Sequence, residues 1–182
     1  MTFNRFTIDN EWQKEIRNNI LVPFYYENAK DGRFVLVDKG KFSEILQQEM
    51  SVDTVLQKEN GEAISVEEKI VRWPGYIYDS FVLETWSCTV KDNERKGWMY
   101  TARCDILFYC FVQENGMDVI AYSIPFRILQ RWFFNGGRFE KYKQTITNQI
   151  NHTECRIVPI VDVMRAIPQT KYHNLSSYFG FQ

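Results

Sequence analysis

The chain opens with apolar positions that have the spacing of a helix. Three apolar residues recur at every fourth position near its beginning, namely Trp12, Ile16 and Ile20. Asp9 or Asn10 can cap the helix, and Pro23 is expected to end it because proline lacks a backbone amide hydrogen. The pattern therefore predicts an amphipathic helix that packs against a core.

Two shorter patterns follow this helix. Residues 34–37, after Gly32, are wholly apolar, which predicts a buried strand. Residues 41–48, after Gly40, again carry apolar side chains at helical spacing and predict a short helix. The first quarter of the chain is thus expected to contain two helices and one strand.

A β-hairpin is predicted next. Residues 52–56 and 63–71 are rich in β-branched side chains, and the connection between them contains Asn60 and Gly61. Asn-Gly is the strongest short signal for a hairpin turn, because both residues tolerate a left-handed backbone. Two antiparallel strands are therefore expected here.

The remaining elements are predicted to be several strands, followed by helices and one more strand. Strands are predicted over residues 81–89, 98–112 and 118–122, the second with a break near Arg103. Ser123 and Pro125 predict the start of a helix that runs to about Phe134, and a more polar helix is predicted over residues 139–149. A last strand, 156–161, precedes a short helix that ends at Pro168. This order is α+β, and without repeats or linkers we expect one domain over residues 1–182.

The composition is that of a folded protein, but the charge limits its partners. Hydrophobic residues make up 45% of the chain, and the formal net charge is −1. Because this charge gives no general attraction to phosphate backbones, any nucleic-acid binding must come from a local basic surface. The loop 91–96 could supply that surface, together with basic residues on the later predicted helices, namely Arg127, Arg131, Arg138, Lys141 and Lys143. Solvated helix faces are the simpler interpretation of the same residues.

Several classes of site are excluded. The four cysteines are scattered, without the paired spacing of a zinc site, and are expected to be reduced. Only His152 and His173 are present, and neither a GxSxG motif nor a phosphate-binding glycine loop occurs. Residues 1–10 do not resemble a signal peptide and no apolar run reaches the length of a membrane span, so we expect a cytoplasmic protein without a membrane partner.

The second strand of the predicted hairpin carries the chemistry. Strand alternation places Glu67 and Lys69 on one face, whereas Glu68 points to the other, which is otherwise apolar. Asp53, on the neighbouring strand, adds a second carboxylate. Two carboxylates beside an ammonium form an oxygen-rich site suited to Mg²⁺ or Mn²⁺ and to phosphodiester hydrolysis.

These residues carry a family resemblance. Asp53, thirteen intervening residues, then Glu67-Glu68-Lys69 resembles the D…(D/E)xK signature of the PD-(D/E)XK, or restriction-endonuclease-like, nucleases, with Val52 in place of the usual proline. The resemblance implies a central mixed β-sheet flanked by helices and a Mg²⁺- or Mn²⁺-dependent nuclease acting on DNA. Asp53 and Glu67 would hold the metal, and Lys69 would orient the attacking water. The resemblance also leaves open whether the protein forms a homodimer or binds a protein partner.

The resemblance implies three further site residues. Gln48 precedes the signature and would contact the metal-bound phosphate, although a solvated helix end is the commoner role of such a residue. Glu84 lies among apolar residues and, with the later Gly97-Trp98, is similar to small members of the superfamily; an outward strand position is its alternative. Glu15 on the first helix would add a carboxylate to the metal site, or be a plain surface residue.

The pairing of the hairpin raises a difficulty. A two-residue turn at Asn60 and Gly61 would place Asp53 opposite Glu68, on the apolar face and away from Glu67. A one-residue bulge would correct this. Bulges and longer glycine-containing loops are common near active sites, and we expect one between Leu56 and Ile64; without it, Glu68 becomes the better partner of Asp53.

A second class of function stays open at this point. The near-neutral charge and the many aromatic residues, 16% of the chain, also suit a non-catalytic binding or inhibitor protein that acts through protein contacts. Such a protein would use the nuclease scaffold or another α+β fold. Metal binding and DNA cleavage distinguish the two hypotheses.

Overall fold

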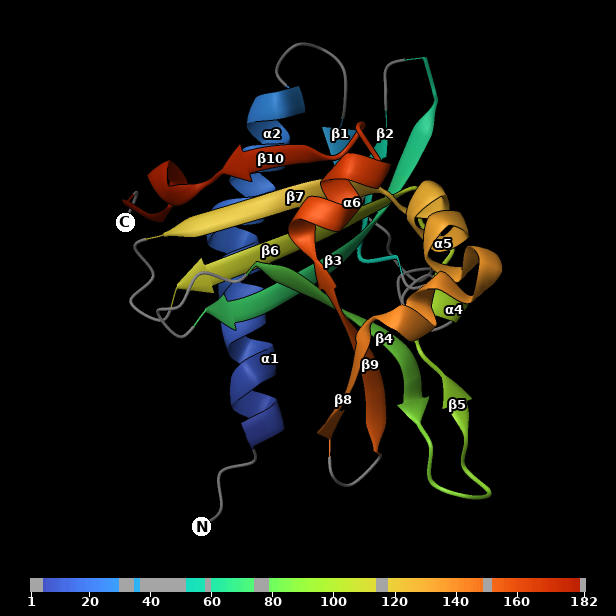
Figure 1. The fold of residues 1–182 in the computed structure, drawn as a ribbon. Coiled ribbons are helices and arrows are strands. Elements are labelled where there is room, and N and C mark those ends of the chain that lie inside the picture. Colours follow the sequence, from blue (N-terminus) through green and yellow to red (C-terminus); the bar gives the residue numbers. More distant parts are fainter. Residues whose placement is uncertain are drawn as a thin grey trace.

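The computed structural model describes residues 5–29, 35–36, 52–57, 60–73, 79–113, 118–148 and 152–180. Helical segments and runs of strands follow one another along the chain (Figure 1). In chain order they are α1 (Arg5–Ile16), η1 (Arg17–Leu21), α2 (Val22–Ala29), β1 (Val35–Leu36), β2 (Thr54–Gln57), β3 (Ala63–Trp73), β4 (Ser80–Cys88), β5 (Arg95–Lys96), α4 (Trp98–Thr101), β6 (Ile106–Gln113), β7 (Val119–Pro125), α5 (Phe126–Phe134), η3 (Asn135–Lys141), β8 (Lys143–Asn148), β9 (Thr153–Pro159), α6 (Ile160–Ala166), β10 (Lys171–Asn174) and η4 (Ser176–Gly180).

The described strands form two sheets. The larger sheet has the order β1-β2-β3-β6-β7-β10, and the smaller one has the order β5-β4-β9-β8. Every pairing is antiparallel except that of β3 with β6, which is parallel, so the larger sheet is mixed. The predicted α+β class, with a mixed sheet flanked by helices, is confirmed.

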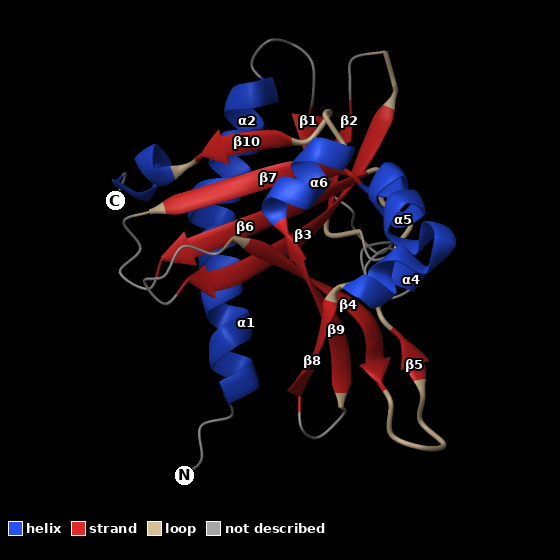
Figure 2. Ribbon diagram, viewed as in Figure 1, coloured by secondary structure: helices blue, strands red, loops and turns tan. Residues whose placement is uncertain are grey.

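The larger sheet has a covered face on each side. The helical segment from α1 to α2 runs behind it, and α6 lies in front of it (Figure 2). Ile16, Ile20 and Tyr25 of that segment pack against one face, where they bury Val66 and Phe108. β3 and β6 are therefore central strands whose alternate side chains enter different cores.

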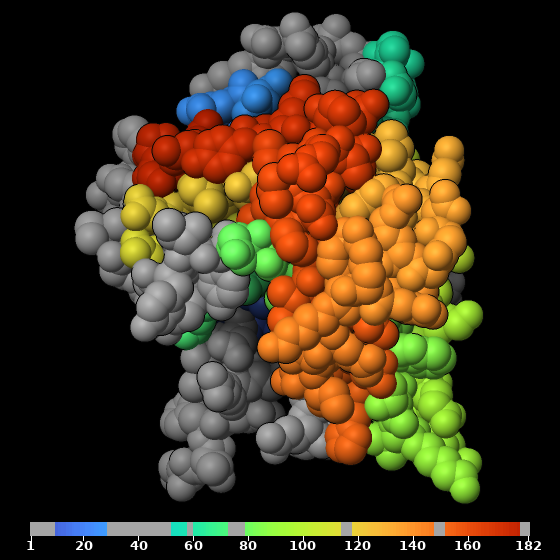
Figure 3. All heavy atoms as spheres, in the orientation of Figure 1, coloured from blue at the N-terminus to red at the C-terminus, as the bar shows by residue number. Residues whose placement is uncertain are grey.

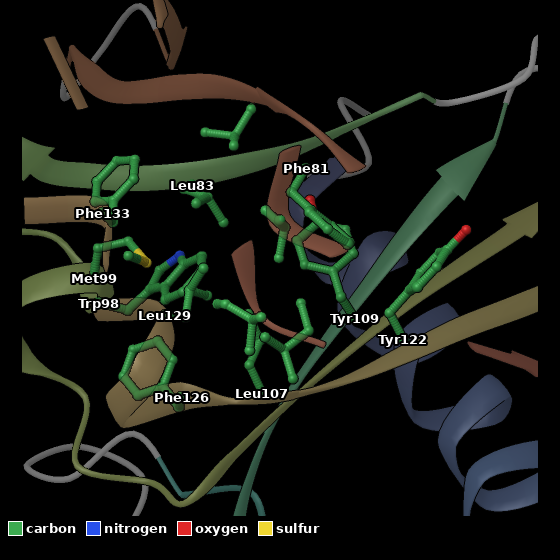
Figure 4. Packing of buried hydrophobic residues seen from close by; sticks show 14 of the residues in the cluster. Phe81, Leu83, Trp98, Met99, Leu107, Tyr109, Tyr122, Phe126, Leu129 and Phe133 are labelled. Carbon is green, nitrogen blue, oxygen red and sulfur yellow. The ribbon is translucent and has the colours of Figure 1, made fainter. Parts of the chain in front are cut away.

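The core on the other face is the larger of the two. It joins β6 and β7 to α5, α6 and the strands β4 and β9 of the smaller sheet. Figure 4 shows its aromatic centre, where Phe81 lies beside Tyr109 and Trp98 lies near Phe126. The rings of the first pair are 5.0 Å apart and those of the second 6.0 Å. This core anchors β4 and α4 beside the same face of β3 that carries Glu67.

The first helix is longer than the sequence predicts. It begins at Arg5 and continues past Pro23 to Ala29 instead of ending at the proline. The turn before Pro23 is π-helical, and the Val22 amide donates to the Arg17 carbonyl five residues earlier. This wider turn accommodates the proline ring, and burial of Ile20, Leu21 and Tyr25 holds the helix on the sheet.

The hairpin register removes the difficulty with Asp53. β2 and β3 are antiparallel as predicted, and Gln57 pairs with Ala63, so the connection covers the five positions 58–62. The pairs from Thr54–Val66 to Gln57–Ala63 are regular, without a bulge. A loop longer than the two-residue turn thus gives the required register, and it places Asp53 opposite Glu67.

Three later elements differ from the sequence prediction. Residues 98–101 form α4 instead of a strand, and residues 143–148 form β8 where a polar helix is predicted. β10 follows the strand predicted to be the last. β8 and β10 are edge strands with mostly exposed side chains, so their strand structure comes from pairing with β9 and β7.

Other predicted elements agree with the structure or cannot be compared with it. The strand over residues 81–89 and the helix to Phe134 are confirmed as β4 and α5, and Asp105 precedes β6 directly. The predicted strand over residues 34–37 contains β1, whereas the helix predicted over 41–48 lies outside the described residues. In the described part, no helix is both long enough and apolar enough to cross a membrane.

Candidate active site

Asp53, Glu67 and Lys69 gather on one face of the β2–β3 hairpin. Asp53 directly precedes β2, and its amide donates to the Val66 carbonyl at 2.9 Å, which continues the strand pairing. Its Oδ2 accepts the Glu68 amide at 2.8 Å, so the carboxylate is held against the backbone of β3. Glu67 and Lys69 lie on the same face of β3 by strand alternation.

Lys69 links the two sides of the site. Its ammonium donates to Oε1 of Glu67, and it lies 5.2 Å from the centre of the Trp98 ring. The Glu67 side chain is 5% exposed, whereas that of Lys69 is 30% exposed. Lys69 is therefore the member of the pair that a substrate could reach.

Glu84 comes to the same site from the smaller sheet. It lies on β4, where burial raises the pKa of its carboxyl, against the charge of Lys69 and a hydrogen bond from the Trp98 amide. Gly97 makes this approach possible, because a Cβ at that position would lie 2.7 Å from the Glu84 carbonyl oxygen. A glycine before Trp98 therefore lets α4 pack directly on β4.

The electrostatics of the site centre on Glu67. The pKa of Glu67 is raised to about 7, chiefly by burial and also by the charge of Asp53, while Lys69 acts against the shift. Burial also disfavours the charged form of Lys69, but Glu67, Asp53 and Glu84 together raise its pKa. At neutral pH the site thus holds an ammonium beside a carboxyl that is close to its midpoint of ionisation.

The neighbouring Glu68 faces the opposite core and has different partners. Arg17 donates from Nε to Oε2 of Glu68 at 3.0 Å and from Nη2 to Thr54 at 2.8 Å, and Thr54 donates to Oε1 of Glu68 at 2.5 Å. Burial raises the pKa of Glu68, against Arg17 and Thr54. The buried Tyr25 phenol lies beside it, and burial together with the charge of Glu68 raises the pKa of Tyr25.

The structure brings together four of the six predicted site residues, namely Asp53, Glu67, Lys69 and Glu84. Glu15 is exposed on α1, the helix that covers the other face of the sheet, and so does not join this cluster. Gln48 lies outside the described residues. The same-face placement of Glu67 and Lys69 follows from strand alternation, but the approach of Glu84 depends on packing between the two sheets.

Two residues of this region went unrecognised by sequence reasoning. Arg17 and Thr54 surround Glu68. The sequence signal that could have indicated them is Glu68 itself, a lone carboxylate on an apolar strand face, because a buried carboxylate needs a partner.

Cys104 also lies close to the site, since burial and the charge of Glu67 raise its pKa to about 12. It is a protonated, buried thiol at neutral pH.

The donor set can be compared with what a divalent cation requires. Within the described ranges, no group of three or more His, Cys, Asp or Glu side chains is arranged to hold a metal ion. Mg²⁺, however, is commonly bound by one or two carboxylates together with water and substrate phosphate. Asp53 and Glu67 form such a pair, and their mutual repulsion, which raises the pKa of Glu67, is what a bound cation would relieve. Asp53 and Glu67 therefore fit a bound Mg²⁺ or Mn²⁺ ion.

Comparison with known proteins adds nothing to the geometry. No protein-family model matches the sequence, and no curated protein matches it either. The functional argument therefore depends on the side chains around Glu67.

Proposed function

We propose that this protein is a divalent-metal-dependent nuclease that hydrolyses phosphodiester bonds in DNA, as its resemblance to the PD-(D/E)XK nucleases implies. The observation that supports the proposal is the register of β2 and β3, in which Asp53 stands opposite Glu67 with Lys69 on the same face. Two carboxylates that can hold a divalent cation, beside one ammonium that can offset negative charge, suit phosphodiester hydrolysis.

Each residue has a distinct role in this proposal. Asp53 and Glu67 hold Mg²⁺ or Mn²⁺, which, when bound, polarises the scissile phosphate and lowers the pKa of a coordinated water. Lys69, the more exposed partner, positions the nucleophilic water and offsets negative charge that develops on the phosphate. Glu84 keeps the Lys69 ammonium charged and oriented through its own negative charge.

The ion pair within the site also supports a ligand-dependent rearrangement. Glu67 accepts a hydrogen bond from Lys69 and shares its surroundings with Asp53, so a bound cation would compete with Lys69 for the Glu67 carboxylate. Because metal ligands must be deprotonated, metal affinity would rise with pH around the Glu67 pKa of about 7. Lys69 would then be the residue placed to face the substrate.

Metal binding is tested by calorimetric titration of the protein with Mn²⁺ and Mg²⁺. The unchanged protein is expected to bind Mn²⁺, and Glu67→Gln, which keeps the shape of the side chain, should weaken binding at least about tenfold by removing a ligand charge. Glu11→Gln, at an exposed position on α1, is the matched control and should bind normally. Equal affinity in Glu67→Gln and the control would remove Glu67 from the metal site.

Cleavage is tested on supercoiled plasmid and on single-stranded DNA with Mn²⁺ or Mg²⁺. Lys69→Ala and Asp53→Ala should each lower the rate by about a hundredfold or more, since each removes a group that acts on the transition state. Lys171→Ala on β10 is the matched lysine control. Retained cleavage in Lys69→Ala would contradict its role, and metal binding without any cleavage would favour the non-catalytic binding protein.

A further inference from the structure

Five exposed basic side chains continue outward from the candidate active site across β5, α4 and α5. We call them the basic stripe: Arg95, Lys96, Arg103, Arg127 and Arg131. The chain as a whole has a formal net charge of −1, so this gathering of positive charge is local. It is the kind of surface that a polyanion recognises.

The short helix α4 connects the stripe to the site. At its first residue the Trp98 amide bonds Glu84, and the Trp98 ring lies beneath Lys69. On the preceding strand the Lys96 ammonium lies 5.3 Å from the centre of the Tyr100 ring. After the helix, Arg103 donates to the Tyr100 carbonyl at 3.1 Å. One turn of helix thus contacts both the carboxylates and the basic side chains.

α5 extends the stripe away from the site. Arg127 donates to the Arg103 carbonyl at 3.2 Å, which places these two residues side by side. Arg131 lies four residues later on the same helix, so it projects from the same face as Arg127. Figure 3 shows that α5 and the residues after it, in orange, form a continuous surface with the β4–β5 region, in light green. Arg103 also precedes Cys104, which lies beside Glu67.

Acidic side chains do not neutralise this surface. Four exposed acidic residues occur in or next to the same segments, namely Asp92, Glu94, Asp105 and Glu140. The Asp105 carboxylate accepts hydrogen bonds from the amide and the hydroxyl of Ser65, at 2.8 and 2.7 Å, so it is occupied within the β3–β6 region. The five basic side chains outnumber the other three acidic ones, which leaves the stripe positive.

The aromatic residues beside the stripe are not available to stack on bases. Tyr100 stacks on Phe134 at a ring distance of 4.2 Å, and Lys96 lies over the Tyr100 ring. Along the described part of the stripe, the large exposed apolar side chain is Ile128, which is aliphatic. Proteins that bind single strands combine basic grooves with exposed aromatic rings, whereas duplex binding depends on phosphate contacts. The surface therefore suits the outside of a double helix.

We propose that the basic stripe binds the phosphate backbone of double-stranded DNA and directs the duplex to the Glu67–Lys69 site. The inference names the form of the substrate, and it rests on the proposed nuclease function. Arg127 and Arg131 contact phosphates beyond the cleavage position, and Lys96 and Arg103 contact those nearest to it. Contacts to phosphates carry no sequence information directly, so we expect this binding to be independent of base sequence.

The test measures binding of fluorescent duplex and single-stranded DNA of equal length without divalent cations, so that no cleavage interferes. The stripe variant combines Arg127→Gln with Arg131→Gln. The matched control combines Lys14→Gln with Arg165→Gln, which removes the same charge from exposed positions on α1 and α6. The stripe variant should bind duplex about tenfold more weakly and reduce the salt-dependence slope by about 2, whereas the control should bind like the unchanged protein.

The outcomes separate this inference from the nuclease proposal. Equal loss of duplex binding in the stripe and control variants, or none in either, overturns the stripe even if the protein cleaves DNA with Mn²⁺. Tighter binding of single strands that is insensitive to the stripe variant also overturns it. Stripe-dependent duplex binding supports the inference, and if no cleavage accompanies it, only the nuclease proposal fails.

Discussion

Glu67 and Glu68 are consecutive residues on one strand, yet they lie in two different electrostatic environments. Glu68 faces the core beneath α1 and α2, where Arg17 and Thr54 donate to its two carboxylate oxygens. Glu67 faces the other core, beside Asp53, and accepts a hydrogen bond from the more exposed Lys69. Both carboxylates are buried, but only one has partners supplied by the covering layer.

The difference separates a buried charge that is paired within the fold from one that the proposed function uses. The Arg17–Thr54–Glu68 group joins helix, β2 and β3, so its removal should destabilise the folded state. In the Glu67 group, burial and the neighbouring Asp53 both raise the pKa of Glu67, an arrangement that is common at functional sites. The comparison predicts that removing Arg17 and removing Lys69 lower the free energy of unfolding by different amounts.

The largest expected effect comes from removing Arg17. Arg17→Met leaves Glu68 buried without its cation, and we expect a loss of about 3 kcal/mol in the free energy of unfolding, the lower end for breaking a buried pair because Arg17 is one-third exposed. Lys69→Met on the other face should lose only about 1 kcal/mol, because Glu67 readily takes up a proton at neutral pH. Urea unfolding at neutral pH measures both.

A double variant checks the cause. Arg17→Met combined with Glu68→Leu removes the buried charge together with its partner and should recover most of the stability lost in Arg17→Met. Arg165→Met, at an exposed position on α6, controls for the loss of an arginine and should change stability little. Equal losses in Arg17→Met and Lys69→Met would mean that the two faces do not differ in this way.

The next effect is a pH dependence that belongs to Glu67. Its pKa is about 7 in the folded protein and near its ordinary value of 4.5 when unfolded, so the folded state binds the proton more tightly. The resulting stability is fully present below the unfolded pKa and is lost as pH rises through the folded pKa. Between about pH 5 and about pH 8 this loss should be about 2.5 kcal/mol without metal.

Glu67→Gln isolates this contribution from that of other titrating groups. The variant cannot ionise at this position, so the difference in unfolding free energy between it and the unchanged protein should rise with pH across this interval. Glu68 contributes to the pH dependence of both proteins and cancels in the difference. A flat difference from acid to neutral pH would show that Glu67 is not perturbed in the folded state.

The sequence predicts the opposite facing of Glu67 and Glu68 better than it predicts the position of Asp53. Alternation along β3 is enough to separate Glu67 from Glu68, since a strand places successive side chains on opposite faces. The register that brings Asp53 opposite Glu67 is less predictable, because it depends on a five-residue connection in place of the two-residue turn that Asn60-Gly61 favours. The pairing of β2 with β3, and not the local turn preference of Asn60-Gly61, therefore sets the register.

Long-range contacts account for the rest of what the sequence does not predict. Glu84 reaches the site through packing between two sheets, and Arg17 reaches Glu68 from a π-helical turn that local helix signals do not indicate. β10 has a polar sequence and pairs with β7 along the edge of the larger sheet. In each case the deciding interaction joins residues far apart in the chain, which periodicity cannot detect.

The smallest expected effect concerns a cation–π contact on each face. Lys69 lies 5.2 Å from the Trp98 ring in a buried setting, whereas the exposed Arg72 lies 4.5 Å from the half-buried Trp12 ring on the other face. Double-mutant cycles with Trp98→Phe and Lys69→Met should give a coupling of about 1 kcal/mol, and those with Trp12→Phe and Arg72→Gln about 0.3 kcal/mol. Desolvation, more than distance, sets this order, because water screens the exposed guanidinium. A larger coupling for Arg72 would mean that proximity dominates and that the Lys69 ammonium is hydrated in the free site.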